Sequence, residues 1–345
     1  MMVIVRMALG ARNIKIPPWS IAALFYGISI ASLVWVFHGV DLSAMWEDFR
    51  SMHWRWLVLA VFTDIAVYAY QGWRWGLLLR PVERVPVWRS IQAIYVGLFA
   101  NEVLPLRPGE VIRPYLQARW SKIPFSVALS SVIIERVFDG IWLIVVFAVT
   151  SFRLSLPRRV TDLAIGLGIV TAVAAVFLAL VMFSKRHAHA AVSATGWGTR
   201  LGVLVEDLHL MGKSFSFYAA AAASLPYLLI QAIPLYAMIR GYDLDLTVWQ
   251  VIVVLVVYRL GTAVPQLPGN VGLSQTALVI GLALFGVDKT TATGLSMMTW
   301  GVITAPLVVA GFIALLLTGG NIAELHRRAK AHVSEPMMAP GPGAR

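Results

Sequence analysis

The chain has 345 residues, of which 59% are hydrophobic and 13% are charged, and its mean hydropathy is +0.77. Soluble domains carry about 25% charged residues, so this composition excludes a soluble enzyme, a disordered protein and a nucleic-acid-binding module. The 28 Lys and Arg residues outnumber the 17 Asp and Glu residues, which in a membrane protein predicts positively charged cytoplasmic loops. Cysteine is absent, which excludes disulfides and thiolate metal sites.

Nine apolar stretches predict an all-α polytopic membrane protein. They are 19–37, 54–79, 90–104, 124–150, 160–183, 215–239, 247–264, 271–286 and 294–318. The first is longer than the apolar region of a cleaved signal peptide, which spans about 7–15 residues, so we expect an uncleaved signal anchor. The stretches 90–104, 247–264 and 271–286 fall short of the roughly 20 residues that a spanning helix needs.

Two breaks rich in proline and glycine interrupt the short stretches. Proline removes a backbone donor and clashes with the preceding turn, so no helix continues through either break. The first break, VLPLRPGEVIRP (103–114), aligns with AVPQLPGNVGLS (263–274) at a spacing of 160 residues. The aligned pairs are Pro105 with Pro265, Pro108 with Pro268, and Gly109 with Gly269. This alignment predicts an internal repeat, with a broken-helix hairpin in each half, over about 54–150 and 215–318.

The distribution of Lys and Arg favours one arrangement in the membrane. If both hairpins are re-entrant, the cytoplasmic segments hold 17 Lys and Arg residues and the outer segments hold 7; if all nine stretches cross, the counts are 11 and 13. The positive-inside rule therefore favours one transmembrane domain with six full crossings, two opposed hairpins and both termini in the cytoplasm. Residues 319–345 then form a partly disordered cytoplasmic tail. The two halves are inverted, and inverted repeats with broken helices are typical of transporters.

Charged residues lie in the middle of several apolar stretches, where each costs about 2.5–3.5 kcal/mol on insertion scales. Glu135, Arg136 and Asp139 share one stretch, and Arg259 lies in another. Two interpretations remain open: a polar cavity, or buried ion pairs that hold helices together, such as Arg136 with Glu110. The number of charges favours the cavity.

Polar residues also follow one face of the second stretch. Asp64, Tyr68 and Gln71 are spaced i, i+4 and i+7, which places them on one side of a helix. Arg74 lies between two tryptophans near the cytoplasmic end of the same stretch. We expect Arg74 to extend to the membrane surface.

The cavity interpretation predicts a site for an anionic headgroup. Arginine pairs bidentately with phosphate, and helix N-termini at Gly109 and Gly269 would present backbone N–H groups to an anion. For Arg259 the alternative is an ion pair with Asp64 or Asp139. We expect no cofactor and no metal site, because the seven histidines lie in loops, at span ends or in the tail. The predicted headgroup-binding residues are Arg107, Glu110, Arg113, Glu135, Arg136, Asp139, Arg259 and Asn270.

Three segments carry a resemblance to a known family. LFANEVLPLRPGEVIRPYLQ (98–117), ALSSVIIERVFDG (128–140) and PQLPGNVGLSQTALV (265–279) resemble the lysylphosphatidylglycerol-synthase transmembrane, or flippase-like, family. The resemblance covers about residues 20–318. It implies a domain that moves lipids between leaflets, without the soluble aminoacyltransferase domain of the multidomain members. Stand-alone members are associated with polyprenyl-linked sugars, envelope glycolipids or hopanoids.

The second motif departs from the family pattern, which usually reads Pro-Gly-Gly-x-Gly-x-x-Glu. Here Asn270 replaces the second glycine and Gln275 replaces the acid, so the resemblance implies no coupling role for position 275. The positions that the resemblance carries over are Asn101, Pro105, Arg107, Gly109, Glu110, Arg113, Glu135, Arg136, Asp139, Pro268 and Gly269.

The sequence thus predicts translocation of a phosphate-bearing lipid or glycolipid across a bacterial cytoplasmic membrane. Two alternatives remain open. One is an intramembrane lipid-modifying transferase, with Glu135 or Asp139 as a base. The other is a non-catalytic partner of an envelope-lipid synthesis enzyme.

Overall fold

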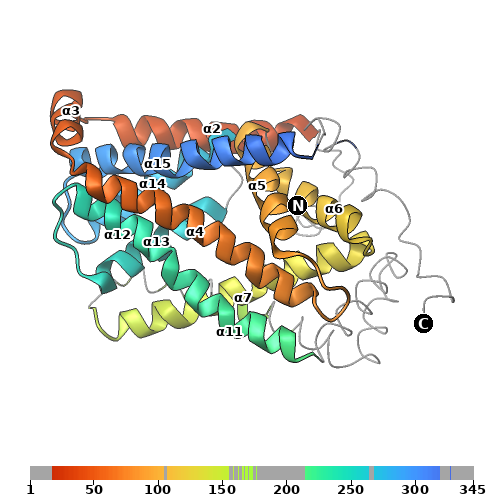
Figure 1. Cartoon of the computed structure of the whole chain (residues 1–345). Helices are drawn as coiled ribbons and strands as arrows, with labels where there is room; N and C mark the ends of the chain where they lie inside the picture. The colour runs from red at the N-terminus through yellow and green to blue at the C-terminus, as the bar shows by residue number, and fades with distance from the viewer. Residues whose placement is uncertain are drawn as a thin grey trace, which may run out of the picture.

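The fold is described from a computed structural model, for residues 18–104, 107–154, 214–263 and 268–318, with a few helical positions between 158 and 176 and Arg327. Each regular element within these residues is a helix, as predicted (Figure 1). Pro105, Pro265, the loop 184–213 and nearly all of the predicted tail lie outside the described residues.

The helices form two series of matching lengths. Helices of 26, 17, 13 and 27 residues are followed by helices of 27, 16, 11 and 28 residues, if α11 and α12 are taken as one span. The first series is α4 (Trp54–Leu79), α5 (Val87–Val103), α6 (Gly109–Ser121) and α7 (Phe125–Ser151). The second is α11 (Phe215–Ile230) with α12 (Ala232–Gly241), α13 (Val248–Ala263), α14 (Leu273–Ala283) and α15 (Lys289–Leu316). The repeat over 54–150 and 215–318 stays a prediction, and these two series of helices occupy the same parts of the chain.

Several helices are long enough to cross a membrane. Phe215–Gly241 and Lys289–Leu316 are both long and apolar enough, and Tyr26–Phe37 with Leu42–Ser51 passes the same test as a pair bent by 83°. Helices α4 and α7 reach about 40 Å at 1.5 Å per residue, but charged residues interrupt their apolar surface. The chain is therefore a membrane protein whose charged residues are concentrated in particular helices.

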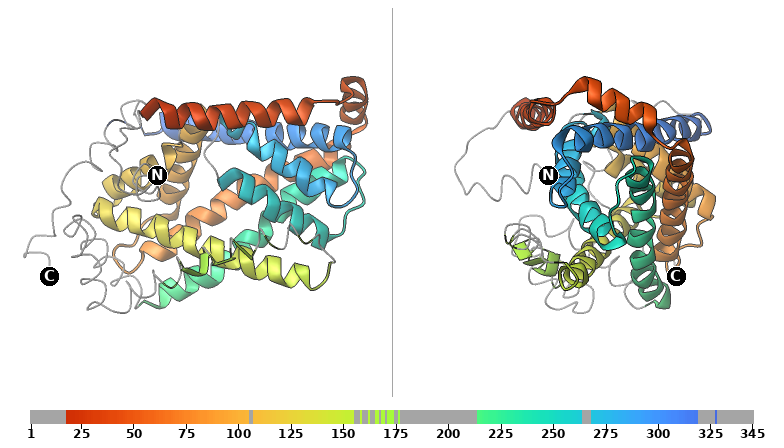
Figure 2. Two further views of the ribbon diagram at one scale, coloured as in Figure 1. Left: turned by 180° about the vertical axis from the view of Figure 1, so that it is seen from behind. Right: turned by 90° about the vertical axis from the view of Figure 1, so that its left-hand side faces the viewer.

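Two helices precede the first series. Helix α2 (Pro18–Phe37) lies on the outside of the bundle and packs against α14 (Figure 2). Helix α3 (Leu42–Ser51) is capped by the preceding Asp41, which accepts hydrogen bonds from the backbone of Ser43 and Ala44. Asp288 caps α15 in the same way through Thr291 N–H, and this bond lowers the pKa of the Asp288 carboxyl.

The two halves pack with equivalent contacts. In each half the first long helix contacts the first short helix, the short helices contact each other, and the second short helix contacts the final long helix. Across the halves, α5 packs on α15 and α13 packs on α7. Helix α4 runs antiparallel to α11 and α12 (Figure 1). The start of α4 lies at the end of α12, where His53 N–H donates to the Gly241 carbonyl, 3.0 Å away.

The loops gather at two ends of the bundle. At one end Thr291 donates to Asp48 over 3.2 Å, and Arg153 lies 5.6 Å from the centre of the Trp249 ring. These contacts bring together the segments 38–55, 151–154, 240–247 and 287–293. At the opposite end Arg89 lies 5.1 Å from the Trp120 ring, so α5 begins where α6 ends.

Each pair of short helices crosses at a glycine. A Cβ on Gly109, the first residue of α6, would lie 1.8 Å from the Gly97 carbonyl oxygen of α5. In the second half, a Cβ on Gly261 would lie 2.4 Å from the Ala277 Cβ. The two crossings pack tightly enough to exclude any side chain at these positions.

One predicted helix start is wrong. Helix α6 begins at Gly109 as expected, but α14 begins at Leu273 and not at Gly269. Gly269, Asn270 and Gly272 have φ angles of 78°, 54° and 112°, which no right-handed helix contains. The aligned glycines therefore have different conformations in the two halves.

We predict that Gly109→Ala prevents correct folding, because the methyl group cannot fit between α5 and α6. The matched control is Gly76→Ala on α4, where a Cβ would meet nothing within 4 Å and alanine favours the helix. Thermal unfolding in detergent should show a strongly lowered midpoint for Gly109→Ala and an unchanged or raised one for Gly76→Ala. Equal midpoints would contradict the close crossing.

Candidate functional site

The break between α5 and α6 contacts the break between α13 and α14. Arg107 donates to the carbonyl of Thr262 near the end of α13. Reciprocally, Asn270 Nδ2 donates to Glu102 Oε1 near the end of α5, over 2.6 Å. Each break therefore binds the last turn of a short helix in the other half.

Local hydrogen bonds fix the two breaks. Asn101 Oδ1 accepts from Gly109 N–H at 2.7 Å, and Trp300 Nε1 donates to the Gly269 carbonyl at 2.6 Å. Arg107 and Asn270 have positive φ angles, 53° and 54°, which let the chain turn sharply at each tip. The tips are therefore held by side chains of the neighbouring helices.

A cavity of about 1210 Å³, counted with the space open to the exterior, lies where the two tips meet. Both halves contribute to its wall, which also includes apolar and aromatic side chains such as Leu98, Tyr227 and Trp300. The charged residues of the wall are Asp64, Glu102, Arg107, Glu110, Arg113, Arg136 and Arg259. The structure thus brings together six of the eight predicted headgroup-binding residues on the cavity wall. They are Arg107, Glu110, Arg113, Arg136, Arg259 and Asn270.

Arg136 and Glu110 form the ion pair that the sequence suggested. Arg136 donates from one nitrogen to both carboxylate oxygens, each 2.8 Å away. The side chains are 50% and 34% exposed, so the pair faces the cavity and not the protein core.

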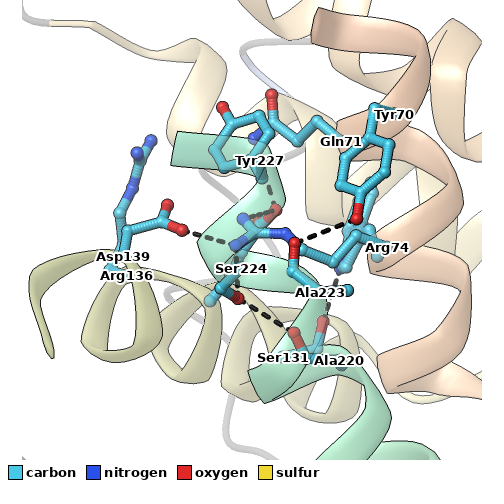
Figure 3. Close-up of polar contacts among 12 residues, drawn as sticks. Tyr70, Gln71, Arg74, Ser131, Arg136, Asp139, Ala220, Ala223, Ser224 and Tyr227 are labelled. Atoms are coloured by element: carbon cyan, nitrogen blue, oxygen red, sulfur yellow. Dashed lines mark hydrogen bonds and ion pairs between the residues drawn. The ribbon is translucent and has the colours of Figure 1, made fainter. Parts of the chain in front are cut away.

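Arg74 is the centre of a buried network, and the prediction that it extends to the membrane surface is wrong. Its side chain is 2% exposed and binds Glu135 at 2.8 Å. It also binds Asp139 at 2.5 Å and Ser224 at 2.6 Å (Figure 3). Its guanidinium also lies 4.3 Å from the centre of the Tyr227 ring. Because the Arg74 guanidinium is removed from solvent, its charge depends on these two carboxylates as partners.

Glu135 connects this network to the cavity. One carboxylate oxygen binds Arg74 and the other accepts from Arg113 at 2.8 Å. Arg113 lines the cavity, whereas Glu135 and Asp139 do not. Glu135 and Asp139 therefore lie behind the cavity wall. Both bind Arg74, and Glu135 also holds Arg113 in place on the wall.

Arg259 has a different environment. No carboxylate oxygen among the described residues lies within 4.0 Å of its guanidinium. The ion pair with Asp64 or Asp139, which was the alternative for Arg259, is therefore absent from this part of the chain. Arg259 lines the cavity at the end of α13 and is partly exposed to it. Its planar donors remain available to a ligand.

The backbone N–H groups at the start of α6 are not available to an anion, contrary to expectation. Asn101 accepts from Gly109 N–H, and the carbonyls of Arg107 and Pro108 accept from the following amides. In the second half, Gln275 accepts from Gly272 N–H at 2.7 Å. The arginine side chains are therefore the cationic donors that the described cavity wall offers to an anion.

Comparison with known proteins identifies the family. The chain matches the profile described as "Lysylphosphatidylglycerol synthase TM region" over residues 20–311. The chain belongs to this family. All charged residues of the cavity wall lie within the matched region. The chain is also similar to the UPF0104 membrane protein MJ1078 of Methanocaldococcus jannaschii, with 23% identity over 236 residues, 65% of this chain and 96% of that protein.

The structure places further residues at the cavity that the sequence patterns did not assign to the site. Glu102, Tyr227 and Trp300 line the cavity, and Arg74 supports it from behind. Glu102 is an acid in an apolar stretch, a signal that could have placed it at the site. For Arg74 the sequence indicated a position at the membrane surface and not at the cavity, because its tryptophan neighbours are typical of a membrane interface.

We predict that Arg74→Leu destabilises this transmembrane domain more than Arg136→Leu does. Removing Arg74 leaves Asp139 without the cation that it binds and leaves Glu135 with Arg113 alone, at a cost of about 3–5 kcal/mol. Arg136 is half exposed to the cavity, so solvent screens Glu110 after its removal and the cost is smaller. Unfolding midpoints of the two variants in one detergent measure the difference, and a larger loss for Arg136→Leu would contradict the assigned burial.

Proposed function

We propose that the protein moves a lipid with an anionic phosphate headgroup between the leaflets of the cytoplasmic membrane. The family consists of membrane regions of proteins related to lipid biosynthesis or transport. The observation that carries the proposal is the cavity where the two hairpin tips meet, with four arginines on its wall. Arginine is suited to phosphate because its planar fork makes two parallel hydrogen bonds.

The arginines differ in how freely they can bind a headgroup. Arg113 is fixed by Glu135, and Arg107 donates to the backbone of the other half. Arg136 keeps half of its side chain exposed to the cavity, and Arg259 makes no ion pair with any described carboxylate. Arg107 lies within electrostatic range of both. We therefore assign the headgroup to the space between Arg136 and Arg259.

The proposal includes an inverted arrangement in the membrane. The α5–α6 and α13–α14 hairpins enter from opposite sides, and both termini face the cytoplasm. Three observations support this arrangement: the 17 to 7 distribution of Lys and Arg, the antiparallel course of α4 and α12, and the contact between the hairpin tips. Each half then closes the cavity from one side, as alternating access requires.

We predict that Arg259→Gln slows translocation of phosphatidylglycerol in proteoliposomes. Losing one charge-assisted pairing costs about 1.5–3 kcal/mol, which is about a tenfold to hundredfold loss of headgroup affinity. Arg259→Lys should also slow translocation, because it keeps the charge and loses the fork. The matched control is Arg153→Gln, which removes an arginine outside the cavity.

The readout is the appearance of labelled lipid in the outer leaflet, with folding checked by monodispersity. Wild-type rates for both Arg259 variants would overturn the headgroup assignment. A new lipid product found by mass spectrometry after incubation with purified protein would instead favour an intramembrane transferase. Wild-type protein that neither moves nor modifies lipid would favour the partner role.

A further inference from the structure

Asp64 is a buried carboxylate that has no close partner among the described residues. Its side chain points into the cavity from α4, on the same face as Tyr68 and Gln71, and the residue is 6% exposed. The other two carboxylates of the cavity wall have partners: Glu102 accepts from Asn270, and Glu110 binds Arg136. Within the described residues, Asp64 has no hydrogen-bond donor on its oxygens and no cation within 4.0 Å.

The cation that acts on Asp64 from a longer distance is Arg259. Arg259 is also the arginine of the cavity wall without an ion pair or side-chain hydrogen bond in the described part of the chain. The Asp64 carboxylate and the Arg259 guanidinium thus face one cavity without contacting each other. Each provides only part of the charge compensation that the other needs.

The remaining groups around Asp64 do not supply a charge in contact with it. The titratable and charged residues that face the cavity or Asp64 from the packed helices are Tyr68 on α4, Tyr95 and Glu102 on α5, Glu110 and Arg113 on α6, Arg136 on α7, Tyr227 on α11, and Tyr258 and Arg259 on α13. Arg107 faces the cavity from the first break, where it donates to the Thr262 carbonyl. Helices α12 and α15 place no titratable side chain on the described cavity wall. Of these groups, Glu102, Glu110, Arg113 and Arg136 are engaged with other partners.

This arrangement links headgroup binding to protonation. A carboxylate in a poorly hydrated site is stable when a cation compensates it or when it binds a proton. In the empty cavity, Arg259 compensates Asp64 across the gap. A phosphate monoanion bound to Arg259 cancels that compensation, so Asp64 then favours its protonated, neutral form.

We propose that Asp64 is a proton-coupling site: it takes up one proton when an anionic headgroup binds Arg259 and releases it when the headgroup leaves. The proton moves from water to an Asp64 carboxylate oxygen, and no covalent bond of the lipid changes. One negative charge and one positive charge enter together, so the loaded and empty cavities carry the same net charge. The inference rests on the proposed function and names a proton gradient as its energy source.

The experiment measures proton uptake on lipid binding. Short-chain phosphatidylglycerol is added to the purified full-length protein in weakly buffered, phospholipid-free detergent, with a pH indicator for protons and calorimetry for binding. The wild type should take up as much as one proton per bound lipid. Its affinity should fall as the pH rises, by up to about tenfold per pH unit, which is the limit for one linked proton.

Two variants and a control make the test specific. Asp64→Asn should bind the lipid with no proton uptake and no pH dependence, and Asp64→Glu should restore both. The control is Asp245→Asn, whose carboxylate is 89% exposed and lies outside the cavity wall, and it should behave like the wild type.

The outcomes separate this inference from the function on which it rests. Lipid binding and translocation by the wild type without proton uptake would overturn the coupling and leave translocation intact. Undiminished uptake by Asp64→Asn would do the same. No binding and no translocation by the wild type would overturn both.

Discussion

The fold depends on hydrogen-bond partners for the backbone groups at the two helix breaks. A break in a helix exposes carbonyl and N–H groups, and each costs several kcal/mol if it faces hydrocarbon. Here the Thr262 carbonyl is bound by Arg107, the Gly269 carbonyl by Trp300, and Gly109 N–H by Asn101. Arg107 lies in the other half of the chain from Thr262, and Trp300 lies on the long helix α15. The tips therefore stabilise each other, and the polar cavity forms where they meet.

The intramembrane charges divide into two groups with different roles. Arg74 and Arg113 together compensate the charges of Glu135 and Asp139, and Arg74 joins α4 to α7 and α11. Arg113 belongs to both groups, because Glu135 holds it while it lines the cavity. This division explains why so many charges can exist in one membrane domain: the buried network fixes the orientation of the helices, and the cavity charges remain available to a ligand.

Much of this arrangement could be predicted from the sequence, because proline and glycine act locally. The breaks, the two series of helices and the Arg136–Glu110 pair follow from residue types and their spacing. The start of α14 could not be predicted, since an alignment of glycines does not reveal that Gly269 has a positive φ in the second half. The position of Arg74 was also inaccessible, because its partners on α7 and α11 are 61 to 150 residues away in the sequence.

The contact between the hairpin tips is the central claim, and the absence of native cysteine makes it directly testable. The double variant Glu102→Cys/Asn270→Cys, treated in native membranes with a short bifunctional thiol reagent, should form an intramolecular cross-link, because these side chains are 2.6 Å apart in the structure. The pair Glu102→Cys/Asp245→Cys should not, because residue 245 lies at the end of the bundle, away from the tips. Failure of the first pair to cross-link, with both cysteines shown to be reactive, would contradict the account.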